Sequence, residues 1–345
     1  MRTDDGRLKR VGDDLLPWLL EEKNPSARFW TLTELLDQPL TDPEVAAAQQ
    51  AIPDMPVVRR ILDAQWPDGF WMHPGVGYSP LHKATVWQII FLAQLGLARC
   101  LPIERAVEYV LAHSRLSGGL VPGTEVPEAR FSAHKDRSGA ILCLNGNLLR
   151  ALSWFGYGED PRLRSTRAAV AAQAVRDGFR CRFSGRTPAG RRPARMRDGL
   201  PCAWGTIKSL GGLLSVPADR RTPSESLAIE EAARFLADHD VTASEPSAES
   251  TASPLWLQFG FPLAYTADLV EWVDVLLEAK GAVCQRTLAA IERILSKQDG
   301  LGRWTLEHSP GNMWAACGRR GSPDKWVTLR ALRAIKKVRE LGSVP

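Results

Sequence analysis

A repeated glycine turn constrains the fold of this chain more than any other feature. The segments Gln65–Trp71 and Gln298–Trp304 both read Gln-x3-Gly-x-Trp, and their first residues lie 233 positions apart. Degenerate copies, Gly118-Gly119 and Asp177-Gly178-Phe179, fall between them at a period of about 58 residues. Such a period predicts a chain built from similar units, each of which packs against its neighbours.

A strongly apolar segment follows each turn. Apolar residues cover most of the circumference of these segments, which is typical of buried helices. We therefore predict inner helices at 81–95, 140–155, 203–214, 263–277 and 326–338.

The segment before each turn has apolar residues at three-to-four spacing with charged residues between them, as in a helix with one wet face. These predicted outer helices are 57–64, 103–112, 162–172, 225–237 and 285–296. Residues 15–22 and 25–36 supply a sixth pair, and 43–51 an extra short helix. The prediction is an all-α (α/α)6 toroid in one domain spanning 1–345, in which 1–54 complete the ring and 55–345 carry the repeats.

Composition and charge favour an ordinary globular protein. Hydrophobic residues make up 44% of the chain and charged residues 24%, with a net charge of +5. No apolar run reaches the roughly 18 to 20 residues of a membrane span, and residues 1–14 lack the apolar core of an export signal. We expect a cytoplasmic protein, and the six widely spaced cysteines favour thiols or metal ligands over disulfides.

A cluster of basic residues stands out near the middle of the chain. Eight arginines fall within 176–197. Such a run is either a solvated loop or a lip that binds phosphate, diphosphate or carboxylate. Nucleic acid is not expected as a partner, because basic residues do not recur on each unit.

The turns and helices together resemble the superfamily of squalene–hopene cyclases and protein prenyltransferase β subunits, and more closely the bacterial "prenyltransferase/squalene oxidase repeat-containing" proteins. The resemblance extends through Cys143–Leu149, Asp177–Cys181, Cys202–Lys208 and Trp326–Leu329. It implies a central cavity and an enzyme of natural product biosynthesis acting on an apolar, isoprenoid-like molecule. The reaction would be that of a cyclase, of isomerase or lyase type, or of a zinc-dependent transferase. The alternative is a non-catalytic binding or scaffold toroid.

The chain departs from the family pattern in its acids. The Asp-x-Asp-Asp acid of class II cyclases is absent, and the only adjacent aspartates lie within residues 4–14. An acid placed elsewhere is therefore needed. Asp268 and Glu271 lie three residues apart in an apolar segment, where burial raises a carboxyl pKa and favours a general acid. His82, at the start of another inner segment, is a third catalytic candidate; pairing of Asp268 with Lys208 or an arginine is the structural alternative.

Three cysteines are candidate metal ligands. Cys143 and Cys202 lie 59 residues apart, the same offset as Gly119 and Gly178, so they occupy equivalent positions on successive units. Cys181 follows the intervening turn, and His134, His308 or water would complete tetrahedral zinc. Simple packing of the thiols is the alternative. No nucleotide cofactor is expected, the ligand is expected to be an apolar or anionic small molecule, and the oligomeric state stays open.

Overall fold

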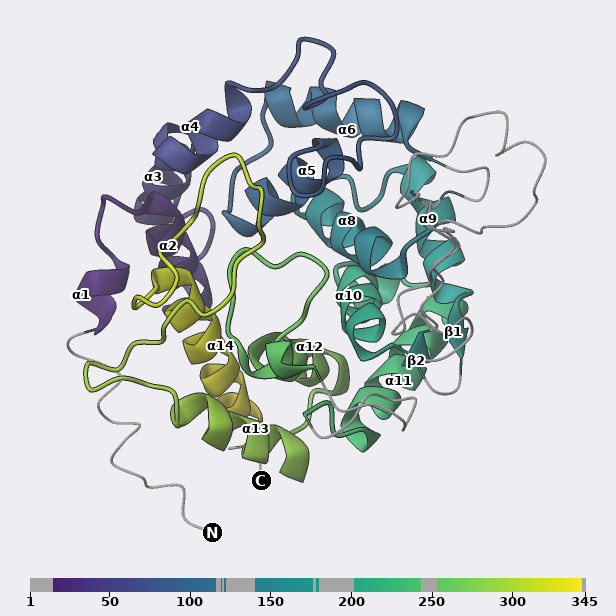
Figure 1. The fold of residues 1–345 in the computed structure, drawn as a ribbon. Coiled ribbons are helices and arrows are strands. Elements are labelled where there is room, and N and C mark those ends of the chain that lie inside the picture. The colour runs from purple at the N-terminus through teal and green to yellow at the C-terminus, as the bar shows by residue number, and fades with distance from the viewer. Residues whose placement is uncertain are drawn as a thin grey trace.

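The described helices form one closed ring (Figure 1). The computed structural model describes residues 15–115, 119, 121, 140–175, 178–179, 202–242 and 253–342. The inner helices are α2 (Pro25–Trp30), continued by the π-helix η2 (Thr31–Leu35), α5 (Thr85–Gln94), α8 (Leu142–Trp154), α10 (Ala203–Leu214), α12 (Leu269–Lys280) and α14 (Lys325–Gly342). The predicted all-α toroid is confirmed.

The outer layer alternates with the inner one along the chain. It consists of α1 (Leu15–Leu19), α4 (Pro56–Leu62), α6 (Leu101–His113), α9 (Pro161–Ala171), α11 (Pro223–Asp238) and α13 (Gln285–Leu295), with α3 (Pro43–Ala51) beside α2. Minor elements are the 3-10 turns η3 (Ile52–Asp54), η4 (Ala218–Arg220) and η5 (Pro254–Leu257) and the antiparallel strands β1 (Ala174–Val175) and β2 (Gly178–Phe179). Outer helices begin at or beside prolines such as Pro161 and Pro223, where a missing N–H leaves no bond unmade.

The two intact copies of the glycine turn make the same contacts. Gln65 Nε2 donates to the carbonyl of Gly69 at 3.1 Å, and Gln298 Nε2 donates to that of Gly302 at 2.9 Å. The indoles of Trp71 and Trp304 are fully buried, and each donates its N–H at 2.7 Å to a carbonyl of the preceding outer helix. These residues therefore fix each outer helix to its turn, as the spacing predicts.

The ring closes where the last inner helix meets the first. Helix α14 packs against α2 and η2, and Trp326 Nε1 donates to Ser26 Oγ at 3.0 Å. Lys325 Nζ pairs with Glu21 at 2.9 Å on the same seam. Segments some 300 residues apart in the sequence are thus neighbours in the ring.

Helices α8 and α10 approach each other very closely in the inner ring. A Cβ on Gly146 would lie 2.2 Å from the carbonyl oxygen of Lys208, and one on Gly212 would lie 2.6 Å from that of Gly146. Any side chain at these positions would push the two helices apart. The glycines let these two inner helices approach backbone to backbone.

The inner helix predicted at 263–277 begins later than expected. Residues 263–268 are not helical; α12 begins at Leu269, after Asp268 caps it by accepting from the N–H of Glu271. The backbone of this run forms bends, and its polar groups pair with side chains of other helices instead of with one another. Residues 258–268, which we call the central loop, cross the middle of the ring, where Figure 1 draws them in green.

Polar side chains of three inner helices hold the central loop. Gln94 on α5 exchanges two hydrogen bonds with the backbone of Leu263, at 2.8 and 2.7 Å. Asn147 on α8 donates to the carbonyl of Ala264 at 2.8 Å, and Arg330 on α14 donates to that of Gly260 at 2.7 Å. The backbone of a buried loop needs such partners. These side chains therefore hold the central loop in one position inside the ring.

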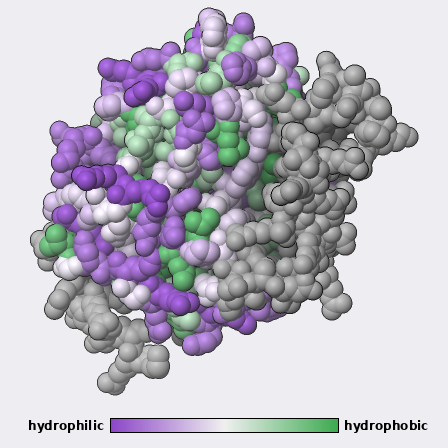
Figure 2. All heavy atoms as spheres, in the orientation of Figure 1, coloured by the Kyte–Doolittle hydropathy of each residue, from purple (hydrophilic) through white to green (hydrophobic). Residues whose placement is uncertain are grey.

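The outer surface is largely polar on the face shown in Figure 2, where hydrophilic residues cover most of the described part and apolar residues occur in small groups between them. Exposed large apolar side chains such as Trp66 and Leu301 lie on separate turns, which is normal for a globular surface. Among the described residues, no helix is long and apolar enough to cross a bilayer.

Candidate functional site

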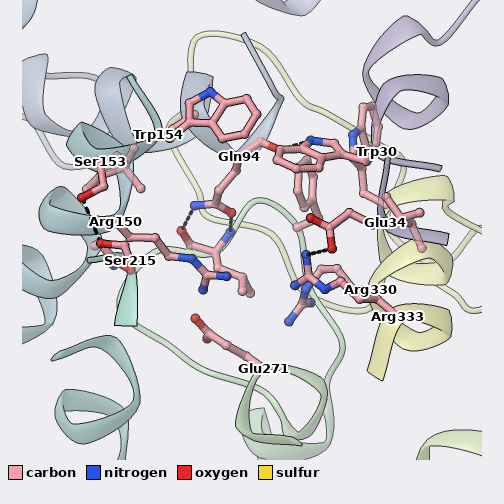
Figure 3. A pocket seen from close by; sticks show the side chains of 18 residues that line it. Trp30, Glu34, Gln94, Arg150, Ser153, Trp154, Ser215, Glu271, Arg330 and Arg333 are labelled. Carbon is pink, nitrogen blue, oxygen red and sulfur yellow. Dashed lines mark hydrogen bonds and ion pairs between the residues drawn. The ribbon is translucent and has the colours of Figure 1, made fainter. Parts of the chain in front are cut away.

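A central cavity of about 390 Å³ lies inside the ring, against the central loop. This volume falls within the range of small-molecule pockets, about 300 to 1,000 Å³. The lining comes from α2 and η2, from α5 and α8, from the C-cap of α10, from α12 and α14 and from the central loop. Figure 3 shows labelled side chains from these elements converging on the cavity.

Aromatic rings form one wall of the cavity. Trp30 and Trp154 lie 4.8 Å apart between ring centroids, and Phe261 stacks on Trp326 at 5.0 Å with their planes 3° apart. The indole N–H groups of Trp30 and Trp154 donate to the carbonyls of Gln94 and Leu97, and that of Trp326 donates to the hydroxyl of Ser26. Because these donors are satisfied inside the protein, the rings present only apolar surface to a ligand.

A buried ion pair borders the opposite side. Lys208 is 2% exposed, and its Nζ lies 2.7 and 2.6 Å from the two carboxylate oxygens of Glu271, which lines the cavity. Burial lowers the pKa of Lys208, and the charge of Glu271 opposes that shift. The carboxylate of Glu271 is therefore held in one orientation at the edge of the cavity.

Asp268 lies in a buried ion pair and not in the purely apolar surroundings that its sequence context predicts. It lies before α12 as the N-cap, and its two oxygens accept from Arg330 Nη1 and Nη2 at 2.8 and 2.7 Å. Burial alone raises the pKa of Asp268, but Arg330 and two backbone N–H donors, those of Gly260 and Glu271, hold it below its ordinary value. The expectation of a raised pKa is wrong, because the charge pair outweighs desolvation. The alternative, pairing with an arginine, is what the structure shows.

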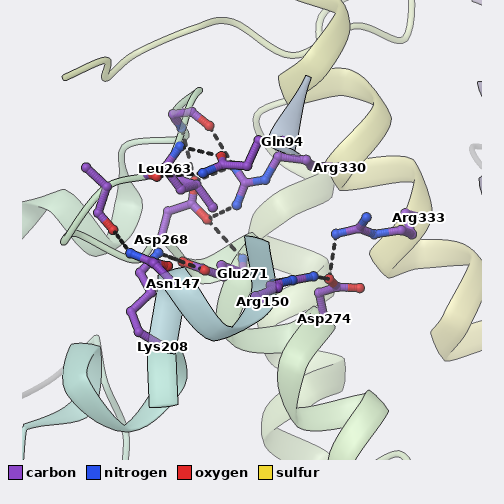
Figure 4. A network of polar contacts seen from close by, with 12 residues as sticks. Gln94, Asn147, Arg150, Lys208, Leu263, Asp268, Glu271, Asp274, Arg330 and Arg333 are labelled. Atoms are coloured by element: carbon purple, nitrogen blue, oxygen red, sulfur yellow. Dashed lines mark hydrogen bonds and ion pairs between the residues drawn. The ribbon is translucent and has the colours of Figure 1, made fainter. Parts of the chain in front are cut away.

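A second buried aspartate was missed. Asp274 is 2% exposed, accepts from Arg333 Nη2 at 2.6 Å and from Lys337 Nζ at 2.7 Å, and lies 4.0 Å from Arg150 (Figure 4). Despite its burial, these cations hold the pKa of Asp274 well below the ordinary value. The signal was present in the sequence, since Asp274 interrupts an apolar segment three residues after Glu271.

His82 does not line the cavity. It lies in the turn before α5, which begins four residues later than predicted, and has a left-handed backbone with φ of 64°. Its Nδ1 lies 2.7 Å from the carbonyl oxygen of Gly311, and burial lowers its pKa. Asn312 and Trp314 donate to the neighbouring carbonyls of Leu81 and Lys83. The histidine therefore helps to join two loops of the ring.

Two of the three predicted metal ligands lie close together. Cys143 is on α8 and Cys202 caps α10; a Cβ built on Gly205 would lie 3.8 Å from the sulfur of Cys143 and 3.6 Å from that of Cys202. Cys181 and His134 lie outside the described residues, as does most of the arginine run at 176–197. Within the described ranges, no three His, Cys, Asp or Glu side chains form a group that could hold a metal. Two sulfurs do not complete a tetrahedral site, and zinc stays a prediction.

No protein-family model and no curated protein sequence matches this chain. Among solved structures, an unsaturated glucuronyl hydrolase specific for heparin is similar over 93% of this chain and 87% of its own, with 12% identity and a TM-score of 0.51. The type II terpene cyclase MstE from Scytonema is similar over 92% and 89%, with 13% identity and a TM-score of 0.46. A variant of that cyclase, in complex with the product merosterolic acid A, is similar over 94% and 98%, with 14% identity and a TM-score of 0.46.

At these identities the likeness defines a fold and no activity. The protein is an α/α toroid with a central cavity of small-molecule size. Folds of this kind carry unrelated chemistries, so function has to be argued from the residues of the cavity.

Proposed function

We propose that this protein binds an apolar, isoprenoid-like small molecule in the central cavity and acts on it as a terpene-cyclase-like enzyme. The observation that supports the proposal is the aromatic wall. Trp30, Trp154, Phe261 and Trp326 line the cavity, and the N–H groups of the three indoles are already hydrogen-bonded within the protein. Aromatic rings bind hydrocarbon through buried area and attract a cation through the ring quadrupole.

The side chains of the cavity suit two steps of a cationic cyclisation. After a double bond of the ligand takes up a proton from solvent, the aromatic rings stabilise the resulting carbocation, and Glu271 is placed to accept the proton that the final carbocation loses, so that the product is an isomer of the substrate. Lys208, at 2.6 Å, keeps Glu271 oriented for that role. Asp268 is given a structural role in this proposal, because its charge is neutralised by Arg330 and its side chain caps α12.

A non-catalytic binding toroid is the second candidate. The observation that favours it is the central loop: Gln94, Asn147 and Arg330, polar residues of the kind that would serve catalysis on inner helices, are engaged in holding it. In this case the cavity carries a ligand without changing it. The two candidates share the same binding site and differ only in turnover.

One experiment separates them. Geraniol, farnesol and geranylgeraniol are titrated into the protein with tryptophan fluorescence as the readout, and the mixtures are analysed for cyclic isomers by gas chromatography and mass spectrometry. Trp154→Leu should weaken binding. Trp66→Leu, at a 55% exposed position outside the cavity, is the matched control and should not. Cyclic products support the enzyme, saturable binding without product supports the carrier, and no binding of any alcohol or of farnesoic acid overturns both.

A further inference from the structure

The central cavity contains an arginine whose donors find no acceptor among the described residues. Arg150 on α8 has a side chain 42% exposed, and its closest described acid oxygen is Asp274 Oδ2 at 4.0 Å, beyond hydrogen-bond distance. Its Nη1 lies over Gly211, 3.6 Å from where a Cβ would stand, and Figure 3 shows the side chain extending into the cavity. The N–H donors of this guanidinium are thus presented to a ligand.

The acid nearest to Arg150 is already occupied. Asp274 accepts hydrogen bonds from Arg333 and Lys337 at 2.6 and 2.7 Å, which are the distances of charge-assisted bonds. Arg333 also lines the cavity, and its Nε is buried without a hydrogen-bond partner in the described part of the chain. The cluster of Arg150, Arg333 and Lys337 therefore offers more donors than Asp274 can accept.

The charges around this cluster indicate what kind of anion fits. Glu34 lies 3.7 Å from Arg333, and Glu278 lies 3.7 Å from Lys337, so three acids face the three cations. Glu34 and Glu271 also line the cavity itself. A second negative charge on a ligand would be repelled by these carboxylates, whereas a single charge held by Arg150 meets unfilled donors. The balance of acidic and basic side chains around Arg150 therefore favours a monoanionic carboxylate over a phosphate or diphosphate.

The carboxylate site and the apolar site are adjacent. Arg150 and Trp154 lie four residues apart on α8, so their side chains share one face of the helix. A ligand whose head group is bound by Arg150 therefore has its apolar body beside Trp154 and Trp30. We propose that Arg150 is the head-group receptor of the central cavity and that the ligand is an apolar carboxylic acid. This inference rests on the proposed function and adds the head group to it.

The test compares three probes that share one hydrocarbon chain. Farnesoic acid, methyl farnesoate and farnesyl monophosphate are titrated into the full chain at pH 7.5, with tryptophan fluorescence as the readout. The wild type should bind the acid about tenfold to a hundredfold more tightly than the ester, the range expected for hydrogen bonds to a charged group. Arg150→Met should remove that preference while leaving affinity for the ester unchanged.

Controls keep the outcome clear. Arg59→Met removes an arginine from an exposed pair on α4 and should keep the wild-type preference. Arg150→Lys, which keeps the charge without the planar fork, should retain part of it. Equal binding of acid and ester by the wild type, an unchanged preference in Arg150→Met, or tighter binding of the phosphate overturns the head-group assignment alone. No binding of any probe overturns the proposed function together with this inference.

Discussion

The guanidinium of Arg330 donates two hydrogen bonds to the carboxylate of Asp268, at 2.7 and 2.8 Å, across the interface between α14 and α12. The same guanidinium donates to the carbonyl of Gly260 in the central loop. Asp268 in turn accepts from the N–H of Gly260 at 3.0 Å and caps α12. One ion pair thus connects two inner helices and the loop between them.

Removal of one member of this pair should strongly destabilise the fold. Arg330→Met leaves Asp268 charged and buried, so we expect a loss of about 3 to 5 kcal/mol in the free energy of unfolding, measured in urea. Arg59→Met, whose partner Asp54 is 75% exposed, is the control and should change that free energy by less than about 1 kcal/mol. A loss as small as that of the control would show that Asp268 is stabilised by its backbone donors alone.

Asp324 should make the protein less stable as pH rises. Burial raises its pKa from 3.8 to about 6, against opposing backbone hydrogen bonds from Val327 and Trp326. The folded state therefore binds this proton more tightly than the unfolded state. The stability contributed by this group is fully present below about pH 4 and is lost as pH rises through about 6.

The variant Asp324→Asn tests that sign. Asparagine caps a helix as well as aspartate does, so α14 should stay capped while the buried charge is gone. We expect a gain of about 1 to 3 kcal/mol at pH 7.5 and little gain at pH 4, from urea unfolding at both values. Asp42→Asn, at the partly exposed N-cap of α3, should change stability by less than about 0.5 kcal/mol. An equal gain at both pH values would contradict the raised pKa.

The pair of Lys208 and Glu271 should behave as a coupled unit. Lys208→Met leaves the buried carboxylate of Glu271 without its partner, and Glu271→Gln leaves the buried ammonium of Lys208 without its partner. Each single change should therefore lower the free energy of unfolding by about 3 kcal/mol or more. The double variant should be more stable than the sum of the two losses predicts, by at least about 1 kcal/mol. Additive losses in this double-mutant cycle would show that the two side chains do not interact in solution.

The thiols of Cys143 and Cys202 give a prediction about metal. If zinc is held there, elemental analysis of chelator-washed protein from metal-replete medium should find about one zinc per chain, and Cys202→Ala should lower it. Cys284→Ala, at the N-cap of outer helix α13, is the control. Unchanged zinc content in Cys202→Ala would eliminate the site. Absence of zinc from the wild type would show that both cysteines only pack against their neighbours.

The sequence predicts the ring well, because the glycine turn and the helix periods are local patterns. Residues 203–214 and 43–51 are helical as predicted, and the contacts of Gln65 and Trp71 recur at Gln298 and Trp304. The central loop was beyond such reasoning. Its backbone is held by Gln94, 169 residues from Leu263, and an apolar run gives no sign that it will cross a ring as irregular backbone.

The chemistry of the site was harder to predict for the same reason. The apolar neighbours of Asp268 indicate burial, and burial alone implies a raised pKa. The direction of the pKa shift is reversed by the charge of Arg330, which lies 62 residues away in the sequence. Arg150 carried no signal at all, because its significance depends on Asp274, the nearest described acid, being already bound to Arg333 and Lys337.

The seam between α2 and α14 has a consequence for how the protein folds. In an open solenoid each added unit is stable on its neighbour, and order can spread along the chain during synthesis. Here α2 buries its face against a helix that follows some 300 residues later, as the hydrogen bond between Ser26 and Trp326 shows. This part of the surface of the first inner helix stays uncovered until nearly all of the ring has been synthesised. Closure of the ring therefore depends on contacts of very high sequence separation, which form late and slow folding.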